Sequence, residues 1–132
     1  MNQVILVGRL TSDPDLVCLD NGMKVSTVSV AVKRPFKSGD SNQYETDFFR
    51  CTLWSGIAEA TVNYCKKGYT VGIKGRLQQK HFVQDGKNLL SYPEIVVEKI
   101  NFISKTSSES EWTPKGVRFF FLIGFLILKN ML

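Results

Sequence analysis

The sequence contains few of the residues that build catalytic and metal centres. It has one histidine, His81, and three widely spaced cysteines, Cys18, Cys51 and Cys65, which form no CxxC pair. A structural metal site needs about four such ligands at suitable spacing, and a nucleophile needs a base and an orienting group. We therefore expect no metal, no cofactor and no enzymatic activity. The cysteines are expected to be reduced thiols of a cytosolic protein, two of them buried.

Long apolar runs and an excess of acidic residues are also missing. The N-terminus, MNQVILVGRL, lacks the basic region of a signal peptide and is expected to form a first strand. An apolar run of ten residues begins at Phe119, whereas a membrane-spanning helix needs about 18 to 20. The 17 basic and 12 acidic residues give a net charge of +5, which favours an anionic partner without identifying it.

What the sequence does contain is a series of short alternating segments separated by turn residues. Strands are expected near residues 4–10, 25–33, 47–54, 69–83 and 89–103, with turns at Asp20-Asn21-Gly22 and residues 84–87 and a polar loop over 34–43. This order predicts an all-β fold, namely a five-stranded OB-fold Greek-key barrel with one short helix between strands 3 and 4.

The predicted helix covers Ser55–Gly68, where apolar residues recur at helical spacing. We expect Ser55 to cap its start, Lys66 and Lys67 to lie in its last turn, and Gly68 to end it. The barrel domain is expected to cover residues 1–104. A short polar linker (105–116) and an atypical apolar C-terminal segment (117–132) complete the predicted organisation.

The segment DFFRCTLW (47–54) predicts a strand with two different faces. Residues 49, 51 and 53 form an apolar face suited to a core, whereas the other face carries Phe48, Arg50, Thr52 and Trp54. The fourth strand repeats the pattern, with Val71, Ile73, Gly75 and Leu77 inward and Lys74, Arg76, Lys80 and Phe82 on the other side. The loop after the second strand adds Lys33, Arg34, Phe36 and Lys37.

Aromatic rings interleaved with cations are suited to single-stranded nucleic acid. Bases stack on the rings, and lysine or arginine neutralises the phosphates, so that neither contact demands a particular base. The same rings could instead cover a second apolar patch or meet a protein partner. A protein-interaction module and an RNA- or oligosaccharide-binding OB-fold therefore stand as alternatives on the residues alone.

Several of these motifs, in this order, resemble the bacterial single-stranded DNA-binding protein (SSB) family over residues 1 to about 104. They are MNQVILVGRLTSDPDL, the DNG turn, AVKRPF, DFFRCTLW with IAEATVNYCKKG, GIKGRLQ and EIVVEKINFI. The resemblance implies an OB-fold that binds and protects single-stranded DNA in replication, repair and recombination. It also implies a homotetramer and a cytoplasmic, nucleoid-associated location.

The resemblance carries over to particular residues. The base-stacking aromatic positions of the family are occupied here by Phe36, Phe48, Trp54 and Phe82. Three of these four are Phe where the best-known members have Trp, which reduces the ring area available to a base. Arg50 and Lys80 match basic positions that face DNA. The full set of predicted phosphate ligands is Lys33, Arg34, Lys37, Arg50, Lys74, Arg76 and Lys80. Phe49 is expected to serve packing or assembly.

The C-terminus departs from the family, which usually ends in an acidic tip that docks onto replication and repair enzymes. Here the end is KGVRFFFLIGFLILKNML, and four basic against two acidic residues follow from Lys105 onward. Recruitment of such partners through an acidic tip is therefore not expected. The segment could be amphipathic or touch a membrane, pack on the barrel or another chain, or represent a frameshifted or read-through end. We favour the third interpretation, because the segment is dominated by Phe, Leu, Ile, Lys and Asn, which AT-rich codons encode. Membrane contact is not expected.

Overall fold

The computed structural model describes residues 1–105, apart from the side chains of residues 84, 88 and 89. The predicted linker beyond Lys105 and the predicted apolar segment (117–132) lie outside these residues. None of the helical structure in residues 1–105 is long and apolar enough to cross a membrane. The elements in chain order are β1 (Val4–Leu10), β2 (Val17–Cys18), β3 (Lys24–Lys37), β4 (Tyr44–Trp54), α1 (Ser55–Tyr64), β5 (Thr70–Gln84) and β6 (Lys87–Ser104).

The five long strands close into a barrel. The sheet order is β1-β5-β6-β4-β3-β2, and β1 also pairs with β3, through Arg9 opposite Ala31 and Leu10 opposite Val30. The β4–β6 pairing is parallel and the others are antiparallel. The helix α1 follows β4 and precedes β5. The predicted OB-fold with one helix between the third and fourth main strands is confirmed, and β2 is a short addition beside β3.

The barrel interior is filled by the inward residues of the strands together with α1. Val30, Cys51, Leu53, Val71 and Ile73 have no exposed surface, and the helix adds Ala58 from one end. Burial raises the pKa of the Cys51 thiol to about 12 and that of Cys65 to about 11, whereas Cys18 is exposed. The prediction of two buried thiols is therefore confirmed.

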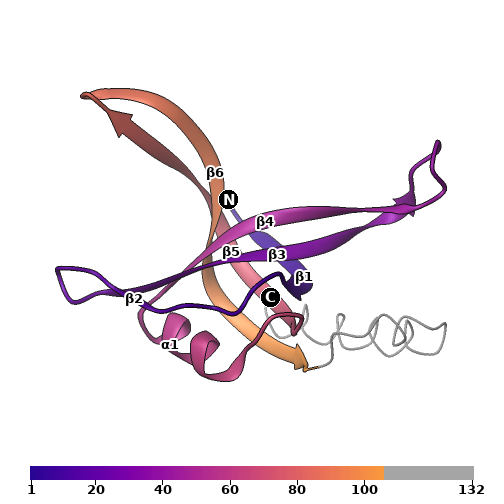
Figure 1. Cartoon of the computed structure of the whole chain (residues 1–132), viewed down its shortest axis with the longest axis horizontal. Helices are drawn as coiled ribbons and strands as arrows, with labels where there is room; N and C mark the ends of the chain where they lie inside the picture. Colours follow the sequence, from indigo (N-terminus) through magenta and orange to yellow (C-terminus); the bar gives the residue numbers. More distant parts are fainter. Residues whose placement is uncertain (106–132) are drawn as a thin grey trace.

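Two hairpins extend beyond the barrel as arms, made by β3–β4 and by β5–β6 (Figure 1). The predicted loop over 34–43 is wrong for its first half, because β3 continues to Lys37. The ladder between β3 and β4 shifts register between Lys33 and Lys37. Pro35 lies in this irregular stretch, where a strand tolerates a residue without an N–H group. Sequence alternation alone does not show such a continuation.

The β5–β6 arm turns at Asp85 and Gly86, which both have positive φ angles, of 54° and 75°, as a tight hairpin requires. Leu77 was predicted to face the core but is half-exposed, because β5 has by then left the barrel. Its backbone is held by Asn2, whose side chain accepts from the Leu77 N–H at 2.9 Å and donates to its carbonyl at 2.8 Å.

The helix is shorter than predicted and ends at Tyr64. Trp54, rather than Ser55, occupies the cap position, without a side-chain hydrogen bond. Lys66 and Lys67 lie beyond the helix, which closes with the Cys65 N–H donating to the Thr61 carbonyl at 2.9 Å. Gly68 does adopt a positive φ of 87°, but in the connection to β5 rather than at the helix end. The helical spacing of apolar residues does not show that the helix ends at Tyr64 and that the following residues form a connection to β5.

Candidate functional site

One face of the sheet carries most of the predicted site residues, because the register of four strands places them together. In β4, Phe48 lies opposite Ala31 of β3, and Thr52 lies opposite Val96 of β6. Directly paired residues share a face, and alternation adds every second neighbour. We call this surface the aromatic face; its members include Lys33, Lys37, Tyr44, Phe48, Arg50, Thr52, Trp54, Arg76, Lys80, Phe82, Tyr92 and Glu94.

The predicted stacking residues differ in how much ring they offer. Phe36 is 70% exposed, Phe48 67% and Phe82 49%, which leaves large apolar areas in water. Trp54 is only partly exposed, since it ends β4 and precedes α1. The rings do not form one stack. Phe36 and Phe48 belong to the β3–β4 arm, whereas Phe82 belongs to the β5–β6 arm, and Trp54 lies at the barrel.

The centre of the aromatic face is buried rather than open. Thr52 was predicted to lie on the face away from the core, but it is only 4% exposed. Its hydroxyl donates to Glu94 Oε2 at 2.9 Å. Glu94 is itself buried at the same place. The bond joins β4 to β6 across their parallel pairing, and the buried carboxylate keeps its hydrogen-bond partner. We infer that ligand contacts are distributed around this centre.

The predicted cations fall into different surroundings. Lys33 and Lys37 place their Nζ atoms 4.7 and 5.7 Å from the centre of the Tyr44 ring, so the arm presents two cations around one aromatic. Arg50 lies with its guanidinium carbon 5.6 Å from the centre of the Tyr92 ring. Three further cations of the predicted set lie along β5 and are partly buried, namely Lys74, Arg76 and Lys80.

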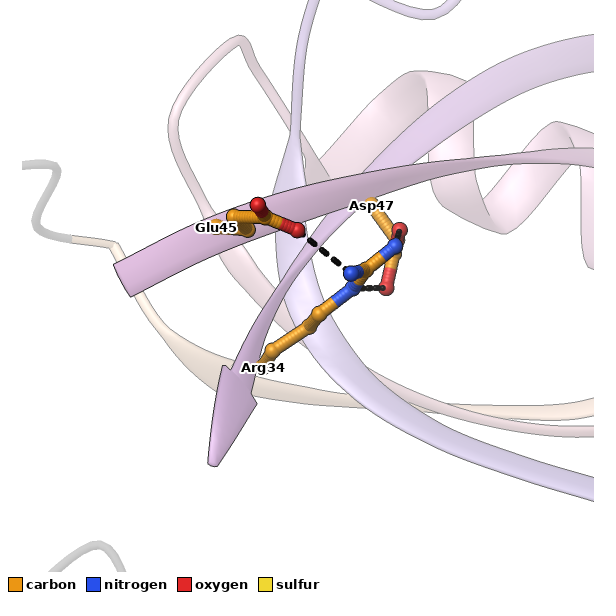
Figure 2. Close-up of polar contacts among 3 residues, drawn as sticks. All are labelled: Arg34, Glu45 and Asp47. Atoms are coloured by element: carbon orange, nitrogen blue, oxygen red, sulfur yellow. Dashed lines mark hydrogen bonds and ion pairs between the residues drawn. The ribbon is translucent and has the colours of Figure 1, made fainter. Parts of the chain in front are cut away.

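Arg34 lies on the other side of the β3–β4 arm from Lys33. Its Nε and Nη2 atoms each donate to Asp47 at 2.9 Å, and its Nη1 atom donates to Glu45. Figure 2 shows the guanidinium between the two carboxylates. The ion pair holds the pKa of Asp47 below, and that of Arg34 above, its usual value. Arg34 is therefore already matched by acidic groups.

Two tyrosines belong to the face but were not predicted. Tyr44 lies between Lys33 and Lys37 as described above. Tyr92 lies opposite Lys80 in the register of β5 and β6, and its ring centre is 5.4 Å from that of Phe82. Alternation within β6, counted back from buried Val96, would have placed Tyr92 on a defined side. The residues that contact Tyr92 from neighbouring strands depend on the strand register, and the register cannot be read from the sequence.

Comparisons with known proteins agree with this geometry. A family model described as "Single-strand binding protein family" matches residues 1–103. The chain is 43% identical over 117 residues to a single-stranded DNA-binding protein of Oceanobacillus iheyensis, covering 88% of the chain and 71% of the relative. It is 40% identical over 108 residues to single-stranded DNA-binding protein B of Bacillus subtilis, covering 82% of the chain and 95% of the relative.

A third relative is single-stranded DNA-binding protein 3 of Listeria innocua, which is 44% identical over 104 residues. That alignment covers 78% of the chain but only 64% of the relative, so the chain spans less than two thirds of that protein's length. The similarity therefore concerns the barrel above all. Because the family model covers 103 of the 132 residues, the chain belongs to the single-strand binding protein family.

Proposed function

We propose that the chain binds single-stranded DNA with little sequence preference and protects it during replication, repair and recombination, without catalysing a reaction. The observation that carries the proposal is the aromatic face, where exposed rings and cations alternate over four strands and two arms. Rings accept any base by stacking, and cations neutralise phosphates. The family membership and the relatives' names support the same ligand.

The test compares two exposed aromatics at different places. Phe48 is 67% exposed on the aromatic face, and Tyr64 is 68% exposed on α1, where its ring contacts Phe102. Phe48→Ala should weaken binding of a labelled oligo-dT by roughly 5- to 100-fold, the loss of one stacked base. Tyr64→Ala should leave binding unchanged. Anisotropy titrations at several salt concentrations give both the affinity and the slope of its decline with salt.

The outcomes separate the proposal from its alternatives. Absence of oligo-dT binding by the unaltered chain would reject the proposal. Equal binding of oligo-rU and oligo-dT would indicate an RNA-binding OB-fold instead. If the chain is instead a protein-interaction module, its affinity for oligo-dT should not depend on Phe48 and should not decline with salt. Thermal melts of both variants show whether either substitution acts through folding.

We also propose that the chain assembles as a homotetramer in the cytoplasm, at the nucleoid. A strand with an unpaired edge promotes self-association, and β1 pairs with β3 only through its last two residues. Light scattering coupled to size exclusion, with and without oligo-dT, should give a protein mass near four times 14.9 kDa. A mass near 14.9 kDa in both runs would contradict the tetramer while leaving DNA binding to its own test.

A further inference from the structure

The hydroxyl of Tyr92 is a buried polar group without a hydrogen-bond partner among the described residues. Buried hydroxyls are nearly always paired, because a buried group that loses its bonds to water destabilises the fold. Tyr92 therefore lowers the stability of the free protein at this atom. Phenylalanine would fill the same space without that cost, so the hydroxyl has no structural role in the described residues that would account for it.

The ring of Tyr92 is held in place by groups from two other strands. Phe82 of β5 packs against it at 5.4 Å between ring centres, with planes tilted by 35°. Arg50 of β4 lies over it, with the guanidinium carbon 5.6 Å from the ring centre. Both neighbours belong to the predicted DNA-binding set. Tyr92 thus contacts both a predicted stacking ring, Phe82, and a predicted phosphate ligand, Arg50.

We propose that Tyr92 binds single-stranded DNA directly, with its ring stacking on a base and its hydroxyl donating to an oxygen of the strand. In the free protein the guanidinium of Arg50 covers the ring where a base would stack. A phosphate attracts that guanidinium more strongly than a neutral ring does, so binding uncovers the ring. This inference rests on the proposed function and adds a fifth aromatic to it.

The acceptor for the hydroxyl is an oxygen of either a phosphate or a base carbonyl. Two oligonucleotides distinguish these sources, oligo-dT and an abasic strand of equal length. If a phosphate accepts, Tyr92→Phe weakens the binding of both strands by the same factor. If a base carbonyl accepts, the substitution weakens oligo-dT binding alone.

The decisive experiment compares Tyr92→Phe with Tyr92→Leu in the full chain, using anisotropy for affinity and thermal melting for stability. Tyr92→Phe should raise the melting temperature, since the unpaired hydroxyl is gone, and should weaken oligo-dT binding by about 3- to 10-fold. Tyr92→Leu should weaken binding further, by on the order of tenfold, because the stacking surface is lost as well. Tyr64→Phe, which removes an exposed hydroxyl from α1, is the control and should change neither quantity.

Opposite changes in stability and affinity support the proposal, because a merely structural tyrosine would change both in the same direction. A lower melting temperature for Tyr92→Phe would show that the hydroxyl is paired in the free protein, which overturns the premise. Unaltered affinity of Tyr92→Leu would overturn the proposal as a whole. If the unaltered chain and Phe48→Ala behave as proposed above, such a result rejects the role of Tyr92 alone.

Discussion

Phe48 and Phe49 are consecutive in β4 and lie on opposite sides of the sheet. Phe48 is exposed on the aromatic face, whereas Phe49 is partly buried and packs against the core beside Cys51 and Leu53. Alternation in the sequence was sufficient to predict this difference, because the period of a strand is two. Two identical side chains at consecutive positions therefore lie in different surroundings, one exposed and one packed against the core.

For Phe49→Ala we expect a loss of stability with DNA contacts retained. Full burial would cost about 3 to 5 kcal/mol, but Phe49 is only partly buried in the single chain, so we expect about 2 kcal/mol. Urea melts give this value, and anisotropy on the folded protein should give an affinity for oligo-dT near that of the unaltered chain. A loss of affinity with an unchanged melt would place Phe49 in the DNA site.

Sequence alternation was less informative where a side chain depends on its neighbours across the sheet. Thr52 has the same parity as Phe48, yet it is buried, because Glu94 of β6 covers it and accepts its hydrogen bond. Tyr92 is likewise defined by Arg50 and Phe82 on two other strands. The parity of a residue follows from the sequence, but its cross-strand partner requires the register.

At the scale of elements, the β3–β4 arm has two chemically different sides. One side carries Lys33, Lys37 and Tyr44, and the other carries Arg34 between Glu45 and Asp47. The sequence predicted the cations as one group, because a loop was expected there and a loop has no faces. The continuation of β3 through Pro35 creates the two sides, and the carboxylates of Glu45 and Asp47 both lie on the side of Arg34.

We predict that Asp47→Asn strengthens DNA binding, because it removes one of the two carboxylates that hold Arg34 and leaves only the contact with Glu45. Because an exposed ion pair of this kind contributes little free energy, the gain should be up to about 5-fold in affinity. If the guanidinium then reaches a phosphate, the slope of affinity against salt should steepen by up to about 0.7. Asp40→Asn, in the turn of the same arm, removes an equal charge without touching Arg34 and is the control.

Equal gains for the Asp47 and Asp40 variants would show a general charge effect and would argue against a phosphate contact by Arg34. Protonation of the Asp47 carboxylate should strengthen DNA binding in the same way as the substitution Asp47→Asn. Because Arg34 lowers the pKa of Asp47 from 3.8, the ion pair is present above that ordinary value and is lost as the pH falls through the lower folded value. The Asp47→Asn variant is the practical test, since it removes the charge without acidic conditions.

At the scale of the whole molecule, closure of the barrel depends on one very close approach of β1 to β3. A Cβ atom on Gly8 would lie 2.4 Å from the Ala31 carbonyl oxygen and 2.7 Å from Val30 Cγ1. The next residues of β1, Arg9 and Leu10, form the pairs with β3 that close the barrel. The glycine is visible in the sequence, but the strand that it must approach is not.

Gly8→Ala should therefore destabilise the barrel, because backbone rather than a flexible side chain would have to move. We expect a loss of roughly 1 to 3 kcal/mol, as for other overpacked sites. Gly56→Ala is the matched control, since its Cβ would meet no atom within 4 Å and it lies in the first turn of α1. Alanine is favoured there by up to about 1 kcal/mol, so the two melting temperatures should move in opposite directions. A Gly8→Ala variant as stable as the parent would contradict this prediction, because it would show that β3 can shift to accommodate the added methyl group at little cost.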